Sequence, residues 1–125
     1  MELKFKSGGK AYSIHILQVR YAQGAGKKCF LVPFNGKPIL YPYSLKRFLH
    51  NAKAFGFVKA QKGYVVNHKA VLKTGHVHHH YAVLDTEQEI YITEKAFEEL
   101  NALMIAARRT IIPPTSGNFP WVTPN

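Results

Sequence analysis

The chain has 125 residues, 46% of them apolar, which is enough for one domain with a buried core. It contains neither an apolar run long enough to cross a bilayer nor an N-terminal secretion signal. Its one cysteine, Cys29, excludes an internal disulfide framework and suits a reducing compartment, so we expect a cytoplasmic protein.

The formal net charge of +10 is distributed unevenly. Fourteen of the 17 lysines and arginines lie between Lys4 and Lys73, a segment without a single acid. Apart from Glu2, every acid lies between Asp85 and Glu99. Such a positive field attracts phosphate polymers or anionic membrane surfaces. The sequence shows neither a basic amphipathic helix nor a lipid anchor, so we expect nucleic acid and no membrane as the partner.

The first third of the chain is predicted to form antiparallel hairpins. Residues 3–16 comprise two extended runs around a Ser-Gly-Gly turn, and a bulge or a single turn is expected near Leu17. Residues 24–28 form a flexible basic loop whose glycines match no nucleotide-binding fingerprint. Residues 29–41 are predicted to form a second hairpin that turns at Asn35-Gly36.

A short helix and a basic turn follow. Ser44 is predicted to cap a helix that ends at Gly56. Residues 57–71 then form a strand, a tight turn at Gly63 and a second strand, because branched and aromatic side chains favour extended chain. No acid lies near this turn, which is surrounded by cations and amides: Lys59, Gln61, Lys62, Asn67 and Lys69.

The last third is predicted to contain two strands and a helix. We expect a strand over 76–84, a turn over 85–88, a strand over 89–92 and a helix that Thr93 caps and that continues to residue 107. The domain is therefore expected to span residues 1–107. Residues 108–125 form a tail with four prolines, which cannot be a regular helix. Its large apolar side chains predict that it docks on the domain or on a neighbouring molecule.

Two local patterns allow other chemistry. If residues 76–84 are one strand, His76, His78 and His80 share a face and could bind zinc or nickel, although ligands on one strand splay apart. The alternative is imidazoles that contact water, or phosphate when protonated. Cys29 beside Lys28 is either a redox thiol with a low pKa or a buried strand residue. No nucleophile, base and orienting acid occur together, so we expect neither an enzyme nor a cofactor.

Four segments, in this order, are similar to sequence motifs of a known domain family. They are Phe5–Ile14, Tyr43–Leu45 at the start of the first helix, Phe57–Asn67 around the basic turn, and Glu89–Thr93 before the last helix. The third is similar to the signature F-x-R-x-H-R-S-Y-hydrophobic-V-N. Over about residues 3–104 the chain therefore resembles the LytTR DNA-binding domain, the output domain of one class of bacterial response regulators.

The resemblance implies a mainly β, elongated arrangement of antiparallel sheets with one short central helix and one C-terminal helix. It also implies binding of duplex DNA through loops in successive major grooves, as a homodimer or as tandem copies on repeated sites, in order to regulate transcription. The implied contact residues are in three loops. They are Lys28 in the first, Gln61 and Lys62 in the second, and Lys95 in the third. The charge around the first two loops adds Lys27, Lys59, Asn67 and Lys69 as candidate DNA contacts. Gln61 and Asn67 are expected to be either polar readers of bases or supports of the turn.

The chain departs from the family in two places. Glu94 followed by Lys95 replaces the arginine that the family commonly has after its serine, so an acid lies where a phosphate is expected. Either Lys95 takes the place of the arginine, or Glu94 accepts a hydrogen bond from a cytosine amino group, or this loop does not bind DNA. Lys62-Gly63 replaces Arg-Ser, which removes a bidentate donor. The family also usually carries a receiver domain before this module. Because the module begins within a few residues of Met1, we expect none here.

Two other functions remain open at this stage. The tyrosines could stack on the bases of single-stranded nucleic acid, including RNA. Alternatively, the basic face and Trp121 in the tail could bind an acidic protein. The salt dependence of binding separates these alternatives, because phosphate contacts release counterions.

Overall fold

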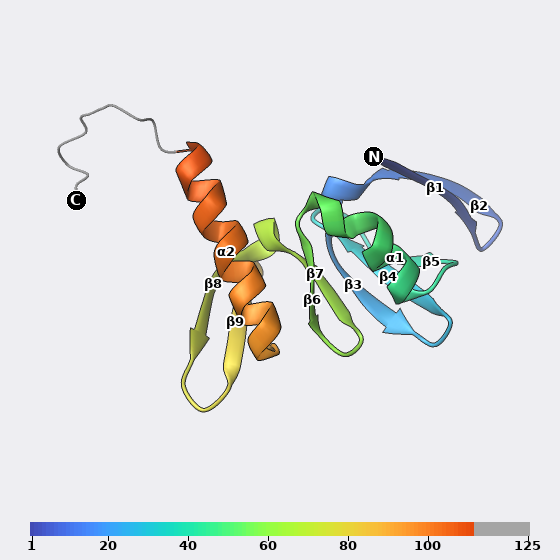
Figure 1. Ribbon diagram of the computed structural model, residues 1–125. Coiled ribbons are helices and arrows are strands. Elements are labelled where there is room, and N and C mark those ends of the chain that lie inside the picture. The colour runs from blue at the N-terminus through green and yellow to red at the C-terminus, as the bar shows by residue number, and fades with distance from the viewer. Residues whose placement is uncertain (112–125) are drawn as a thin grey trace.

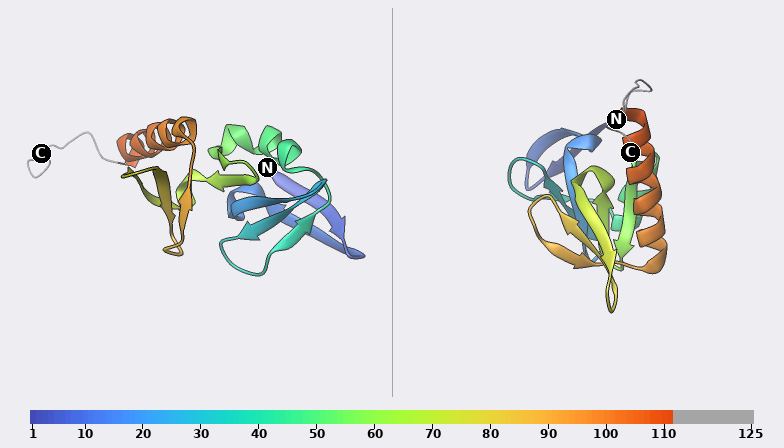
Figure 2. Two further views of the ribbon diagram at one scale, coloured as in Figure 1. Left: turned by 90° about the horizontal axis from the view of Figure 1, so that it is seen from below. Right: turned by 90° about the vertical axis from the view of Figure 1, so that its left-hand side faces the viewer.

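The computed structural model describes residues 1–111, which form three antiparallel sheets in a row (Figure 1). Both long helices, α1 and α2, lie on the same side of this row (Figure 2). The molecule is therefore elongated and mainly β, as expected from the sequence. No helix within the described residues is long and apolar enough to span a bilayer.

The first sheet is a hairpin, and the second has five strands. Strands β1 (Glu2–Ser7) and β2 (Lys10–His15) form the first sheet, and the 3₁₀ turn η1 (Ile16–Gln18) follows it. The second sheet has the order β5-β4-β3-β7-β6. Its strands are β3 (Val19–Ala25), β4 (Lys28–Pro33), β5 (Ile39–Tyr41), β6 (Phe57–Gln61) and β7 (Tyr64–Asn67).

The third sheet is a meander that carries the C-terminal helix. The 3₁₀ turn η3 (His68–Ala70) connects β7 to this sheet, whose order is β10-β9-β8. Its strands are β8 (Val71–His76), β9 (His80–Leu84) and β10 (Glu89–Tyr91), and α2 (Glu94–Ile111) follows.

Both helices begin as the sequence predicts. The Ser44 hydroxyl accepts a hydrogen bond from the Arg47 amide at 3.1 Å and caps α1 (Leu45–Ala52). The 3₁₀ turn η2 (Lys53–Phe55) extends this helix to Gly56, whose φ is +85°. The Thr93 hydroxyl accepts from the Ala96 amide at 3.1 Å, and capping of this kind satisfies a backbone donor that has no partner within the helix.

Two hydrophobic cores lie on either side of β6 and β7. Phe57 and Val65 pack into the core that α1 covers with Phe48. The next residues along the same strands, Val58 and Val66, pack into the core that α2 covers. Successive side chains of a strand point to opposite faces, so this hairpin contributes to both cores at once. It thereby fixes the third sheet against the second.

Several predicted boundaries are wrong. Strand β7 ends at Asn67 rather than near residue 71, and the predicted loop 24–28 is only a two-residue turn between β3 and β4. Residues 76–84 are not one strand, because the chain turns between β8 and β9 and pairs His76 with His80. Gly75 does not end the strand: it leaves space for the Tyr81 ring, which a side chain at that position would strike. The helix α2 continues to Ile111, so the first four residues of the predicted tail are helical. The predicted docking of residues 112–125, and with it Trp121, lies outside the described residues.

Candidate nucleic-acid interface

Three basic segments meet at one edge of the molecule, the lower edge in Figure 1. They are the β3–β4 turn, the β6–β7 turn and the start of α2. The Gly24 amide donates to the Gly63 carbonyl at 2.9 Å and joins the first two. The Thr93 amide donates to the Ala60 carbonyl at 2.9 Å and brings in the third. We call residues 24–28, 61–63 and 93–95 the loop face.

The loop face is rich in unpaired cations. Its four lysines are all exposed: Lys27, Lys28, Lys62 and Lys95. Among the residues that the structure describes, none of these four ammonium groups lies within 4 Å of a carboxylate, because the one ion pair found there joins Arg20 to Asp85. Glu94 is the single acid of the loop face and is also exposed. A surface of this composition attracts phosphate and leaves the lysines free to contact it.

The β6–β7 turn projects Lys62 because of its backbone geometry. Gln61 pairs with Tyr64, which leaves Lys62 and Gly63 as the two turn residues. Gly63 has φ +84°, a conformation that costs glycine little and other residues more. The Tyr64 ring stacks on Tyr21 of β3 with the ring centroids 5.2 Å apart. The turn is thus supported at its base, and Lys62 lies at its exposed tip.

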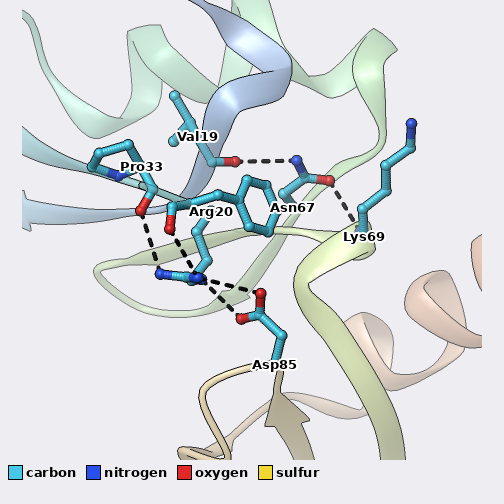
Figure 3. A network of polar contacts seen from close by, with 7 residues as sticks. Val19, Arg20, Pro33, Asn67, Lys69 and Asp85 are labelled. Atoms are coloured by element: carbon cyan, nitrogen blue, oxygen red, sulfur yellow. Dashed lines mark hydrogen bonds and ion pairs between the residues drawn. The ribbon is translucent and has the colours of Figure 1, made fainter. Parts of the chain in front are cut away.

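Asn67 holds the backbone together inside the fold. Its side chain is fully buried. The amide nitrogen donates to the Val19 carbonyl at 3.1 Å, and the amide oxygen accepts from the Lys69 backbone at 3.0 Å (Figure 3). Lys69 itself is exposed but follows the end of β7 that is remote from the turn. The structure therefore brings neither residue to the loop face.

Lys59 is the remaining predicted contact, and it lies on β6 next to the loop face. Its exposed side chain lines a pocket of about 460 Å³ together with Lys53, Lys62, Lys95 and Glu99. Sequence reasoning did not assign Lys53 or Glu99 to this pocket. These two residues lie on different helices and approach β6 only through the tertiary fold, so no local pattern could have identified them.

The histidines do not form the row of ligands that one alternative required. His76 and His80 lie on paired strands, and their rings stack in parallel with centroids 4.0 Å apart. The His79 ring packs against Tyr91, with the centroids also 4.0 Å apart. Within the described part of the chain, no three potential ligands are placed to hold a metal ion. The alternative in which His76, His78 and His80 share one face of a single strand is therefore wrong.

Cys29 is not a reactive thiol. It is fully buried in the core beneath α1, and burial raises its pKa to about 11. A reactive cysteine needs an accessible thiolate near neutral pH. The alternative of a redox thiol with a low pKa is therefore wrong, and Cys29 acts as a small core residue.

Comparisons with known proteins agree with this geometry. A search of solved structures finds the LytTr DNA-binding domain of a methyl-accepting/DNA response regulator from Bacillus cereus, with a TM-score of 0.66 and 14% identity. The match covers 82% of this chain and 95% of that one, so the two share a fold. The curated proteins include no match. The model of the LytTr DNA-binding domain matches residues 9–105. This chain therefore belongs to the LytTr DNA-binding domain family.

Proposed function

We propose that this chain regulates transcription in the bacterial cytoplasm by binding specific duplex DNA through the loop face. The family supports DNA binding in general, and the loop face supports this more specific mode. The observation that carries the proposal is the pair of backbone hydrogen bonds that Gly63 and Ala60 accept from Gly24 and Thr93. These two bonds gather three cationic segments, far apart in sequence, at one edge.

Each segment has a role in this proposal. Lys28, Lys62 and Lys95 enter or approach the major groove, while Lys27 and Lys59 contact phosphates at its sides. Gln61 is half-buried beside Lys62 and offers an amide that can read a base edge. The major groove is about 12 Å wide, so a two-residue turn fits into it. Two copies bound to repeated sites would extend the contact along the duplex.

Single-stranded binding is less well supported. A stacking platform needs several aromatic rings free on one face. Here the Tyr41 ring is buried against Phe5 and Phe48, and Tyr21 and Tyr64 are already stacked on each other. Packing in the core and between hairpin strands accounts for these rings. An acidic protein partner remains a distinct outcome of the test below.

A fluorescence-anisotropy titration tests the proposal. The full chain is titrated with duplex DNA, single-stranded DNA and RNA of equal length at two salt concentrations. We expect tight binding to duplex whose affinity falls steeply with salt, with a log–log slope of roughly −4 to −5 if about five phosphates are contacted. A preference for single strands would contradict the proposal. Absence of binding even at low salt would assign the basic surface to a protein partner.

A further inference from the structure

A cationic pocket opens beside the loop face, between the two helices. Its floor is β6, and its walls are the end of α1 and the first turns of α2. In Figure 1, α2 lies on one side of β6 and α1 on the other, and Figure 2 shows both helices on the same face of the sheets. The pocket has a volume of about 460 Å³, within the range of sites that hold a small molecule. Ten residues line it: Leu49, Lys53, Phe57, Val58, Lys59, Gln61, Lys62, Thr93, Lys95 and Glu99.

The charges in the pocket select for an anion with several negative groups. Four lysines, on η2, β6, the β6–β7 turn and α2, line the pocket together with one acid, Glu99. Within the described residues, none of these lysines has a carboxylate partner within 4 Å. A concave surface with cations on opposite sides focuses the field more strongly than lysines on a convex face. A single phosphate would occupy only part of this volume, so two or more anionic groups fit better.

The other residues that line the pocket favour a ligand that has an apolar part. Phe57 and Val58 are nearly fully buried, and Leu49 is half-buried beside them. These side chains form the apolar part of the lining. Gln61 and Thr93 add an amide and a hydroxyl to the lining, and Glu99 can accept a hydrogen bond from a ligand N–H or O–H group. The lining therefore combines cations, an apolar surface and one acceptor, as small-molecule sites usually do.

We propose that this pocket binds a small polyanion with two or more phosphate or carboxylate groups on a flat apolar body. We further propose that this ligand competes with duplex DNA. The competition rests on the proposed function, because Lys62 and Lys95 line the pocket and also belong to the loop face. An ammonium group held by the ligand is not available to DNA. The ligand thus lowers the apparent DNA affinity in proportion to its occupancy.

The test uses a nucleotide as the probe. Amide resonances of the full chain are followed by NMR during titration with ATP, with inorganic pyrophosphate and with adenosine. We expect ATP to bind with a Kd below 1 mM and to shift the amides of Val58, Lys59 and Thr93. Pyrophosphate should bind more weakly and adenosine not at all, since the anionic groups supply the attraction. ATP shifts spread evenly over the basic surface would overturn the proposal.

Two variants distinguish ATP binding in this pocket from attraction by the overall positive charge of the chain. Lys53→Ala removes a pocket cation that is outside the loop face, and Lys37→Ala removes an exposed cation from the β4–β5 connection. We expect Lys53→Ala to weaken ATP binding at least threefold and DNA binding less than twofold, while Lys37→Ala changes neither. Equal effects of the two variants on ATP binding would contradict a specific pocket.

The two proposals fail in different ways. Displacement of labelled duplex by ATP from wild type, and less displacement from Lys53→Ala, would support the competition. If ATP binds the pocket but leaves bound duplex in place, the competition is wrong. If duplex does not bind at all while ATP still shifts the pocket amides, the proposed function is wrong and the polyanion site stands.

Discussion

Arg20 on β3 and Asp85 after β9 form an ion pair that connects the second sheet to the third (Figure 3). The Arg20 Nε donates to one carboxylate oxygen at 2.8 Å, and Nη2 donates to the other at 3.3 Å. The same guanidinium donates to the carbonyls of Pro33 and Phe34 at 3.3 and 3.2 Å. The two side chains are 17% and 29% exposed, so water screens this pair less than a surface pair.

Replacing Arg20 should therefore destabilise the fold. We expect Arg20→Lys to lower the free energy of unfolding by about 1.5–3 kcal/mol, because an ammonium cannot keep four hydrogen bonds in this planar arrangement. Urea unfolding measures the change. Arg47→Lys is the matched control, since Arg47 is exposed and lies over the Tyr43 ring. It should cost less than 1 kcal/mol. Equal losses in the two variants would show that the Arg20 network adds little.

Asn67 should affect stability without affecting DNA binding. Asn67→Ala leaves the Val19 carbonyl and the Lys69 amide without their side-chain partner, which should cost about 1–3 kcal/mol. Urea unfolding measures this loss. DNA affinity measured where the variant is fully folded should stay within twofold of wild type. A tenfold loss of affinity in a variant of normal stability would instead show that the amide reads a base.

The thiol of Cys29 should make stability fall at high pH. Its pKa in the fold is about 11, above the ordinary value of 9.0, so the unfolded chain loses this proton first. The stability that the neutral thiol contributes is complete below pH 9 and is lost as the pH rises towards 11. We compare urea midpoints at pH 8 and pH 10.5 for wild type and Cys29→Ala. Wild type should lose more stability between these pH values than Cys29→Ala. The two proteins share all other titrating groups, so the difference between them reports on the thiol.

Alkylation provides an independent check on Cys29. Iodoacetamide at pH 8 should label the native chain far more slowly than the chain in urea, because the buried thiol is neutral and inaccessible. Rapid labelling of the native protein would contradict this account of the pKa.

Local chemistry made much of the fold predictable. The turns at Gly8-Gly9 and Asn35-Gly36, and the caps Ser44 and Thr93, depend on residues a few positions apart, and the structure has all four elements that they predict. The hairpin of β8 and β9 was missed for a physical reason. Glycine normally marks a turn, but Gly75 lies within β8 because the Tyr81 ring occupies the space of its missing side chain.

The site was predictable in part. Basic turns are visible in the sequence, and the family resemblance indicates their use. Their meeting point depends on backbone bonds between distant residues, such as Gly24 to Gly63, which leave no pattern in the chain. The two roles open to Asn67 in the sequence, reader or support, differ only in which groups surround it. Burial of the amide favours the supporting role.

The loop-face lysines should carry DNA affinity. Lys28→Ala with Lys62→Ala should weaken duplex binding by about 2–4 kcal/mol if both contact base edges, and by less if they contact only phosphate. The matched control is Lys37→Ala with Lys69→Ala. It removes the same charge from exposed lysines beyond the opposite ends of β4 and β7. Anisotropy titrations at fixed salt measure both. Equal losses in the two double variants would contradict binding through the loop face.

The start of α2 combines an acid and a cation, and single-charge variants separate their effects. Lys95→Gln should weaken duplex binding and reduce the magnitude of the salt slope by about 1, because one phosphate contact is lost. Glu94→Gln should strengthen binding, because it removes a carboxylate from the loop face. The same change should cost about 0.3–1 kcal/mol of stability, since Glu94 lies in the first turn of a helix, where negative charge is favourable.

Glu87→Gln is the control for the gain in affinity. Glu87 lies in the turn between β9 and β10, at the end of these strands remote from the start of α2, because Tyr91 before the helix pairs with Tyr81 near the start of β9. It changes the net charge by the same amount as Glu94→Gln. If Glu94→Gln strengthens binding and Glu87→Gln does not, the carboxylate of Glu94 faces the duplex. If both variants strengthen binding equally, only the total charge matters and the third segment stays off the DNA.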